Sequence, residues 1–257
     1  MRRIKLTIAY DGTAYAGWQK QDGAVTVAGT VENAIRELTK ETPELLGASR
    51  TDAGVHALGN VAVFDTDSPI PAERFSYALN AFLPDDIRIM ESEEAPENFH
   101  PRFDAHSKRY EYHIVTGQVC PPLAVRYAEH VRGELDIEAM NRMAQYAVGT
   151  HDFTSLCAAG AQVKSKVRTI TKLSVTKEAG EIVIAVEGDG FLYNMVRILA
   201  GTLIQAGLHR ITPESMQDIL EGRDRSLAGP TAAARGLRLC FIRYGQQSSS
   251  GAGEAED

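Results

Sequence analysis

Apolar and polar residues alternate along several short stretches of the chain, and this period of two predicts β-strands. In residues 3–10, for example, the apolar side chains of Ile4, Leu6, Ile8 and Tyr10 share one side of the predicted strand. Further strands are predicted at residues 45–48, 60–66, 87–90, 108–115, 169–176, 182–187 and 237–241.

Between these stretches the apolar residues recur every three or four positions, which predicts amphipathic helices. The first helix is predicted at residues 27–38, with Thr30 as a candidate N-terminal cap. The second follows Pro71, a residue that suits the first turn of a helix, and its buried side is expected to include Phe82. A third is expected to begin after Asp136. Others are predicted at residues 191–208 and 213–220.

The order of these elements is β-α-β-β-α-β, and it occurs twice along the chain. This order is typical of a ferredoxin-like unit, so the sequence predicts an α+β protein with one unit at residues 1–105 and another at 106–245. Each unit is expected to place two helices on one face of its sheet and to leave the other face for a partner or a cleft. Residues 246–257 are rich in Ser, Gly and Glu, which predicts a disordered tail.

The composition is that of an ordinary globular protein, with 44% hydrophobic and 24% charged residues among 257. The three cysteines are far apart and form no C-x-x-C motif, which excludes a disulfide scaffold and fits a reducing cytosol. No apolar run approaches the roughly 20 residues of a membrane span. We therefore expect a cytoplasmic protein.

The common cofactor motifs are missing from the sequence. It has no G-x-x-x-x-G-K-[ST] loop, and Tyr193 follows Gly188-Asp189-Gly190 where a dinucleotide fingerprint requires its third glycine. No two of the seven histidines have the spacing of metal ligands. We expect neither a nucleotide cofactor nor a metal.

The charge pattern leaves the partner open. With 27 basic and 34 acidic residues, the net charge of −7 argues mildly against a nucleic-acid partner. Basic residues nevertheless gather locally, and Lys164, Lys166 and Arg168 lie in a segment without acids. A basic stripe of this kind on an acidic protein could bind a phosphate backbone, and it is equally compatible with a surface that contacts only solvent.

One segment combines charge with special backbone residues. Residues 50–57, Arg-Thr-Asp-Ala-Gly-Val-His-Ala, lie between two apolar strands, and the simplest interpretation is a turn, because Asp and Gly are common in turns. Arg50 and Asp52 are two residues apart, however, so an extended backbone would project both charges to the same side. Charges beside a sheet core are costly to desolvate unless a function requires them. From the residues alone, a turn and a functional site are both open.

Residues 49–57 resemble the signature of the TruA family of tRNA pseudouridine synthases, whose aspartate is catalytic. Further motifs resemble the family along nearly the whole chain. They are Tyr10-Asp11-Gly12-Thr13, Gly17-Trp18-Gln19-Lys20-Gln21, Ala78-Leu79-Asn80-Ala81, Phe99-His100-Pro101-Arg102-Phe103, Lys108-Arg109-Tyr110-Glu111-Tyr112, His151-Asp152-Phe153-Thr154 and Gly190-Phe191-Leu192-Tyr193-Asn194-Met195-Val196-Arg197. Two positions depart from the pattern: Ser49 stands where the family more often has Gly, and residues 229–237 match its Ala-Pro-x-x-Gly-Leu motif loosely.

The resemblance implies a reaction that cleaves the N1–C1′ bond of a uridine, turns the base and rejoins it through C5, without a cofactor. Asp52 would be the catalytic carboxylate, either as a nucleophile or as a base. Arg197 would pair with Asp52, forking onto the carboxylate as a lysine could not, and would hold it ionised in a dry pocket. Tyr110 would stack on the uracil and Leu237 would pack on its other face, although periodicity alone assigns both to the core.

The resemblance also implies the partner and the assembly. The substrate would be tRNA, modified at positions 38–40 of the anticodon stem-loop, with Arg50 on the backbone of the extruded nucleotide. Lys164, Lys166 and Arg168 are candidates for gripping a tRNA arm. The protein would be a homodimer. Its two RRM-like units would join into one continuous, mixed but mainly antiparallel sheet, with helices on one face and a central cleft for RNA.

Two other functions compete with the isomerase. A non-catalytic RNA-binding protein could be built from two RRM-like units, although neither unit contains the Lys/Arg-Gly-Phe-Gly-Phe strand of such domains. A carboxylate-pair hydrolase would need a second acid near Asp52, and Asp11 and Asp65 are the nearest candidates in the sequence.

Overall fold

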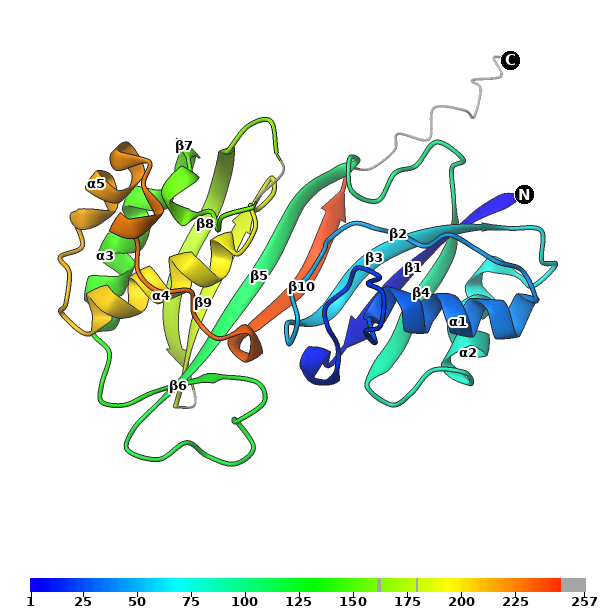
Figure 1. The fold of residues 1–257 in the computed structure, drawn as a ribbon, viewed down its shortest axis with the longest axis horizontal. Helices are drawn as coiled ribbons and strands as arrows, with labels where there is room; N and C mark the ends of the chain where they lie inside the picture. Colours follow the sequence, from blue (N-terminus) through cyan, green and yellow to red (C-terminus); the bar gives the residue numbers. More distant parts are fainter. Residues whose placement is uncertain (161–162, 179, 246–257) are drawn as a thin grey trace, which may run out of the picture.

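The computed structural model describes residues 1–160, 163–178 and 180–245, so the predicted tail at 246–257 lies outside the described residues. Within these ranges ten strands form one mixed sheet, and five α-helices pack against it (Figure 1). No helix in the described part of the chain is long and apolar enough to cross a bilayer. The predicted α+β class is confirmed.

The first half of the chain has the predicted order of elements. They are β1 (Arg2–Tyr10), α1 (Val27–Thr39), β2 (Leu46–Gly47), β3 (His56–Thr66), α2 (Phe75–Asn80) and β4 (Ile87–Ala95). Two details of the prediction are wrong. Thr26, and not Thr30, caps α1, because the Thr26 hydroxyl accepts a hydrogen bond from the Gly29 amide. Helix α2 ends at Asn80, so Phe82 lies beyond it and is half exposed.

The second half repeats this order with additional elements. They are β5 (Ala105–Thr116), β6 (Glu129–Val131), α3 (Ile137–Ala147), β7 (Gly149–Asp152), β8 (Val167–Glu178), β9 (Glu181–Gly188), α4 (Met195–Gly207), α5 (Ser215–Gly222) and β10 (Leu237–Tyr244). Asp136 caps α3 as predicted, and its carboxylate accepts a hydrogen bond from the Ala139 amide. Helix α4 begins four residues later than predicted, because Asn194 has a left-handed backbone (φ 58°). Alternation does not predict the short strands β6 and β7.

The two halves join at the first residues of β3. The strand order is β4-β1-β3-β10-β5-β9-β8-β7. Strand β2 pairs with β3 at Ala62 and Val63, whereas β10 pairs in parallel with β3 at His56 and Ala57. Strand β1 pairs with one edge of β3 along most of its length, whereas the partner on the other edge changes from β10 to β2. The loop from β2 to β3, residues 48–55, lies at this change, and it is the segment that the sequence singled out.

The two faces of the sheet differ in character. Apolar side chains from all five described helices join one face of the sheet in a single core, which includes Leu6, Tyr112 and Ile184. The helices therefore cover one face, as the sequence predicts. Residues that alternate with these core positions, such as Glu111, project from the opposite face.

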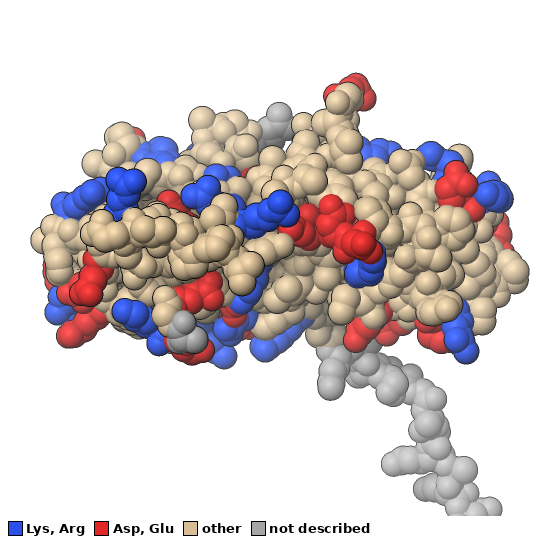
Figure 2. Space-filling view, turned by 90° about the horizontal axis from the view of Figure 1, so that it is seen from below, with Lys and Arg blue, Asp and Glu red and all other residues tan. Residues whose placement is uncertain are grey.

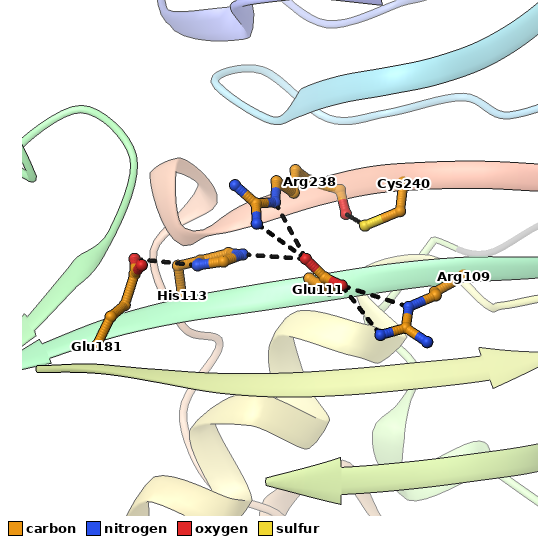
Figure 3. Close-up of polar contacts among 6 residues, drawn as sticks. All are labelled: Arg109, Glu111, His113, Glu181, Arg238 and Cys240. Carbon is orange, nitrogen blue, oxygen red and sulfur yellow. Dashed lines mark hydrogen bonds and ion pairs between the residues drawn. The ribbon is translucent and has the colours of Figure 1, made fainter. Parts of the chain in front are cut away.

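A network of charged side chains links β5, β9 and β10 on that opposite face (Figure 3). Glu111 accepts hydrogen bonds from Arg238 of β10 at 2.9 Å and from Arg109 at 3.1 Å. His113 lies between the carboxylates of Glu111 and Glu181, at 3.4 and 3.0 Å. Burial alone would raise the pKa of Glu111, but the hydrogen bonds from the arginines lower it to about 2. The network thus strengthens the sheet beside the junction of the two halves.

We predict that Glu111→Gln lowers the free energy of unfolding at neutral pH by about 1 kcal/mol, because it weakens a partly exposed pair of ionic hydrogen bonds. The pKa of Glu111 in the folded protein lies below its ordinary value of 4.5. The ionised carboxylate therefore stabilises the fold above about pH 4.5, and this stabilisation is lost as the pH falls toward 2. Urea unfolding near pH 7 and near pH 3 measures the effect.

The difference between Glu111→Gln and the wild type should be smaller at the lower pH. Glu178→Gln, at the exposed end of β8, is the matched control and should behave as the wild type does at both values. An equal effect of Glu111→Gln on the free energy of unfolding at both pH values would contradict the low pKa assigned to Glu111.

Candidate active site

A cavity of about 450 Å³ lies where the two halves of the sheet meet. Of the described residues that line it, Asp52 is the only acid. The basic residues of its lining are Arg50, Arg102, Lys108, Arg168 and Arg197. The rest of the wall includes the aromatic rings of Tyr110 and Phe191. One carboxylate among several cations and rings suits an aromatic ligand attached to a polyanion.

The loop that contains Asp52 is a turn, as the simplest interpretation of the sequence expects. The Val55 amide donates to the Asp52 carbonyl oxygen at 3.1 Å, and Gly54 has a φ of +77°. The Trp18 amide donates to the Thr51 carbonyl oxygen at 3.0 Å, which attaches the loop to the segment between β1 and α1. The turn also directs Asp52 into the cavity, so the two interpretations of this segment are compatible.

Two glycines of the first half pack directly against this loop. A Cβ atom on Gly12 would lie 2.0 Å from the carbonyl oxygen of Val55, and one on Gly17 would lie 2.7 Å from that of Thr51. Gly17 also has a φ of +100°, which side chains rarely tolerate. The motif at residues 10–21 therefore supports the loop, a role that the sequence motif alone does not reveal.

Arg197 of α4 reaches Asp52 from the second half of the chain. Its Nη1 lies 3.2 Å from Oδ2 of Asp52. The same guanidinium donates to the side-chain oxygen of Asn194 at 2.9 Å and to the carbonyl oxygen of Ala232 at 2.8 Å. The expected fork onto the carboxylate is wrong, because only Nη1 of Arg197 contacts Asp52, and this nitrogen also contacts Asn194 while Nε binds Ala232.

The surroundings of Asp52 act on its pKa in opposite directions. Burial raises the pKa, and the hydrogen bond and the positive charge of Arg197 lower it. Burial is the larger effect, so the pKa of Asp52 lies above its ordinary value of 3.8. Arg197 therefore offsets only part of the desolvation of the carboxylate.

Tyr110 and Leu237 form neighbouring parts of the cavity wall. Both side chains are more than nine-tenths buried and belong to the core cluster, yet both also line the cavity. Phe191 packs edge-on against Tyr110, with ring centroids 5.3 Å apart. Burial raises the pKa of the Tyr110 phenol to about 12, so the phenol is protonated at neutral pH.

Of the four other basic residues predicted to contact tRNA, two line the cavity and two do not. Arg50 is exposed and Arg168 is half-buried, and both line the cavity. Lys164 is exposed and Lys166 is half-buried, and neither lines it. Acidic and basic side chains are interspersed over the face shown in Figure 2, so the excess of cations is a property of the cavity and not of that face.

The two other acids that the sequence suggested lie elsewhere. The Asp11 carboxylate accepts hydrogen bonds from Thr13 and, at 2.9 Å, from the Tyr127 hydroxyl. Asp65 pairs with Arg3 at 2.8 Å. Neither acid lines the cavity, so the described residues offer no second carboxylate for a carboxylate-pair hydrolase.

Sequence reasoning assigned no role to Lys108 or Asn194, which also line the cavity. Lys108 lies two residues before Tyr110 in β5, so strand alternation would have placed both side chains on one face. Asn194 orients Arg197, and no feature of the sequence signals the backbone conformation that allows this.

The fold and the cavity define an α+β protein that places one carboxylate, an arginine and a tyrosine where the two halves of its mixed sheet meet, which suits an enzyme acting on nucleic acid. A family model described as tRNA pseudouridine synthase matches residues 6–104 and 143–245. The chain belongs to this family and is an RNA isomerase, which converts uridine in tRNA to pseudouridine.

Similar proteins cover nearly the whole chain. The tRNA pseudouridine synthase A of Acetivibrio thermocellus is 51% identical over 244 residues, which are 95% of this chain and 100% of the relative. The tRNA pseudouridine synthase A 2 of Clostridium tetani is 50% identical over 245 residues, 95% of this chain and 99% of the relative. A solved structure titled "Crystal Structure of a Cbf5-Nop10-Gar1 Complex" covers 92% of this chain and 48% of that chain, at 10% identity and a TM-score of 0.38, a likeness too distant to carry an argument.

We predict that Gly12→Ala lowers the rate of uridine isomerisation at least tenfold, because the new Cβ must push the Val55 carbonyl and the loop away from their positions. Overpacking of this kind typically destabilises a protein by about 1–3 kcal/mol. Single-turnover rates at a temperature well below the unfolding midpoint separate the loss of activity from the loss of stability. Gly245→Ala, whose Cβ would have no atom within 4 Å, is the matched control. Normal activity of Gly12→Ala would show that the loop does not depend on this contact.

Proposed function

We propose that Asp52 is the catalytic residue of the uridine isomerisation. The observation that carries this proposal is the position of Asp52: it is the only acid among the described residues lining the cavity, and Arg197 contacts it at 3.2 Å. The cavity takes residues from both proposed units, 1–105 and 106–245, so the units act together. Its volume lies in the range of ordinary ligand pockets, about 300–1,000 Å³.

The chemistry requires one carboxylate and a pocket that holds a detached base. Asp52 begins the reaction either as a nucleophile toward the ribose or the uracil, or as a base at the ribose. The N1–C1′ bond breaks, the uracil turns, and a C5–C1′ bond forms. The proton of C5 is then lost and N1 gains one, so that no atoms are added or removed overall.

The neighbouring side chains hold the nucleotide in this scheme. The uracil stacks on Tyr110 and packs against Leu237, and stacking on an aromatic ring contributes about 1–3 kcal/mol per base. Extrusion of the nucleotide costs a few kcal/mol of unstacking. Arg50 and Arg168 offset this cost by binding the backbone phosphates at the cavity.

We propose the anticodon stem-loop of tRNA, positions 38–40, as the place of modification. The similarity of the chain to tRNA pseudouridine synthases A supports this choice. Recognition would depend on shape and backbone, because side chains cannot read the deep groove of an A-form stem. Lys164 and Lys166 lie outside the cavity lining, where they could contact a more distant part of the tRNA.

We also propose a homodimer that acts in the cytosol. Leu58, Met90 and Tyr127 are about half exposed around a second cavity of about 340 Å³, which includes His56 and Arg238 on the sheet face opposite the helices. Exposed apolar patches of this kind mark interaction surfaces. The three cysteines are unpaired within the described residues, as the cytosol allows.

The central prediction is that Asp52→Asn abolishes isomerisation and leaves tRNA binding intact. Removal of an essential catalytic group typically lowers the rate by at least roughly 10³-fold, whereas the cations that bind the tRNA are unchanged. The measurement is the release of tritium from C5-labelled uridine in unmodified tRNA, together with filter binding. Transcripts in which only positions 38–40 are labelled test the proposed target. Asp218→Asn, on the exposed side of α5, is the matched control. Release by Asp52→Asn at the wild-type rate would remove Asp52 from the reaction.

A second prediction concerns the pH dependence. Arg197 lowers the pKa of Asp52, so Arg197→Gln should raise that pKa further above its ordinary value. Because the ionised carboxylate is the active form, the acid limb of the pH–rate profile should move to higher pH. Arg197→Lys keeps a positive charge and should shift the limb less, although it loses activity because it cannot also bind Asn194 and Ala232. An acid limb at the same pH in all three proteins would contradict the pairing.

A further inference from the structure

Residues 230–237, the wall segment, hold two parts of the cavity in place. The Ala232 carbonyl oxygen accepts the hydrogen bond from Nε of Arg197, and the Ala232 amide donates to the Arg197 carbonyl oxygen at 3.1 Å. Leu237, the last residue of the wall segment, lines the cavity. The wall segment therefore fixes the guanidinium that contacts Asp52 and supplies part of the surface on which the uracil is proposed to pack.

A glutamate of β6 anchors the wall segment beside these contacts. Oε2 of Glu129 accepts a hydrogen bond from the Ala233 amide at 3.1 Å. The hydroxyl of Tyr112, a fully buried residue of β5, contacts the same carboxylate oxygen and lies 2.8 Å from the Ala233 carbonyl oxygen. Two residues further on, Nε of Arg235 donates to the carbonyl oxygen of Ala128 at 3.2 Å. The start of β6 thus binds the wall segment at two places.

The backbone of the wall segment also packs closely on its neighbours. A Cβ atom on Gly236 would lie 2.7 Å from Cζ of Tyr112 and 2.9 Å from the carbonyl oxygen of His113. At the other end, a Cβ atom on Gly201 of α4 would lie 1.8 Å from the carbonyl oxygen of Pro230. Close-packed groups transmit a displacement because they have no space in which to absorb it. A shift of the anchored residue would therefore reach the rest of the wall segment.

We propose that Glu129 is a positioning residue for the isomerisation; this rests on the proposed function. Glu129 holds Ala233, and thereby keeps the neighbouring carbonyl of Ala232 where it binds the Arg197 guanidinium. The guanidinium is then directed at Asp52. Glu129 is not among the residues that line the cavity, so it acts on the reaction through these contacts.

A purely structural role would leave the chemistry of the site unchanged. If Glu129 only stabilises the fold, its removal lowers the unfolding midpoint, and the molecules that remain folded keep the pH dependence of the wild type. If it positions Arg197, its removal weakens the contact of the guanidinium with Asp52. The pKa of the aspartate then rises, because Arg197 is what lowers it. The acid limb of the pH–rate profile should therefore move to higher pH, in the same direction as in Arg197→Gln.

The test is single-turnover isomerisation of unmodified tRNA across the acidic and neutral pH range, together with filter binding of the tRNA. Glu129→Ala should lower the rate at neutral pH roughly tenfold to a hundredfold, because a small misplacement at an active site can cost about 10²-fold. It should also move the acid limb to higher pH and leave tRNA binding unchanged. Glu129→Gln keeps an oxygen that can accept both hydrogen bonds, so it should restore most of the rate and the position of the acid limb.

A second comparison places the effect at Arg197. In the Arg197→Gln background, Glu129→Ala should cause little further loss of rate, because the guanidinium that Glu129 positions is already absent. Glu134→Ala, exposed in the loop after β6, is the matched control and should change neither the rate nor the acid limb.

Thermal unfolding shows whether each variant is folded at the assay temperature. If Glu129→Ala is not, Tyr112→Phe, which removes the hydroxyl that contacts Glu129 and Ala233, takes its place with the same expected shift. A lower rate with an unmoved acid limb would assign Glu129 to stability alone and overturn the proposal. An equal loss with and without Arg197, or an unchanged rate, would overturn it too. If the wild type itself converts no uridine, the proposed function fails, and the positioning role fails with it.

Discussion

The contact between Asp52 and Arg197 depends on a very short piece of sheet. Only two residue pairs, His56 with Arg238 and Ala57 with Leu239, connect β3 to β10. On one side of this junction lies the loop with Asp52, and on the other lies the wall with Tyr110, Leu237 and Arg197. A shift of β10 along β3 by one residue would turn Leu239 away from the core and would separate the carboxylate from its arginine.

The site also shows how a fold can support an unfavourable charge. Burial raises the pKa of Asp52, and one nitrogen of Arg197 offsets this in part. The arginine itself is fixed by Asn194 and Ala232, so the cost of desolvating two charges is distributed over several segments. On the other face of the sheet, Glu111 has a low pKa because two arginines contact it. Contacts between carboxylates and arginines thus lower the pKa of Glu111 strongly, whereas at Asp52 burial outweighs them.

The sequence predicts this fold well where the determining interactions are local. Alternation located most of the strands, and Asp136 was recognisable as a cap because it directly precedes an apolar helical period. The errors arise where two local choices are nearly equal or where a single residue departs from regular geometry. Thr26 and Thr30 are both reasonable caps, and only the backbone decides between them. A bulge between Leu239 and Phe241 changes which side chains share a face of β10, and a hydrophobic pattern contains no sign of it.

The residues of the candidate site were less predictable from local patterns than the fold was. Asp52, Arg197 and Tyr110 were found through motifs of a known family, and periodicity alone would have assigned Tyr110 to the core. The supporting contacts of Gly12 and Gly17, and the contact of Lys108 with Ser49, depend on which distant segments come together. The glycine contacts follow from the pairing of β1 with β3, and the contact of Lys108 with Ser49 brings β5 of the second half to the loop; no local pattern specifies either.

The position of β10 has a consequence for biosynthesis. It is the last strand of the described chain, yet it lies in the middle of the sheet, between β3 and β5. While the polypeptide is still emerging from the ribosome, the neighbours of β10 expose unpaired backbone edges, which are prone to association with other chains. The last strand to be synthesised therefore completes the middle of the sheet, and a premature stop before residue 237 would leave two open edges beside the cavity that contains Asp52.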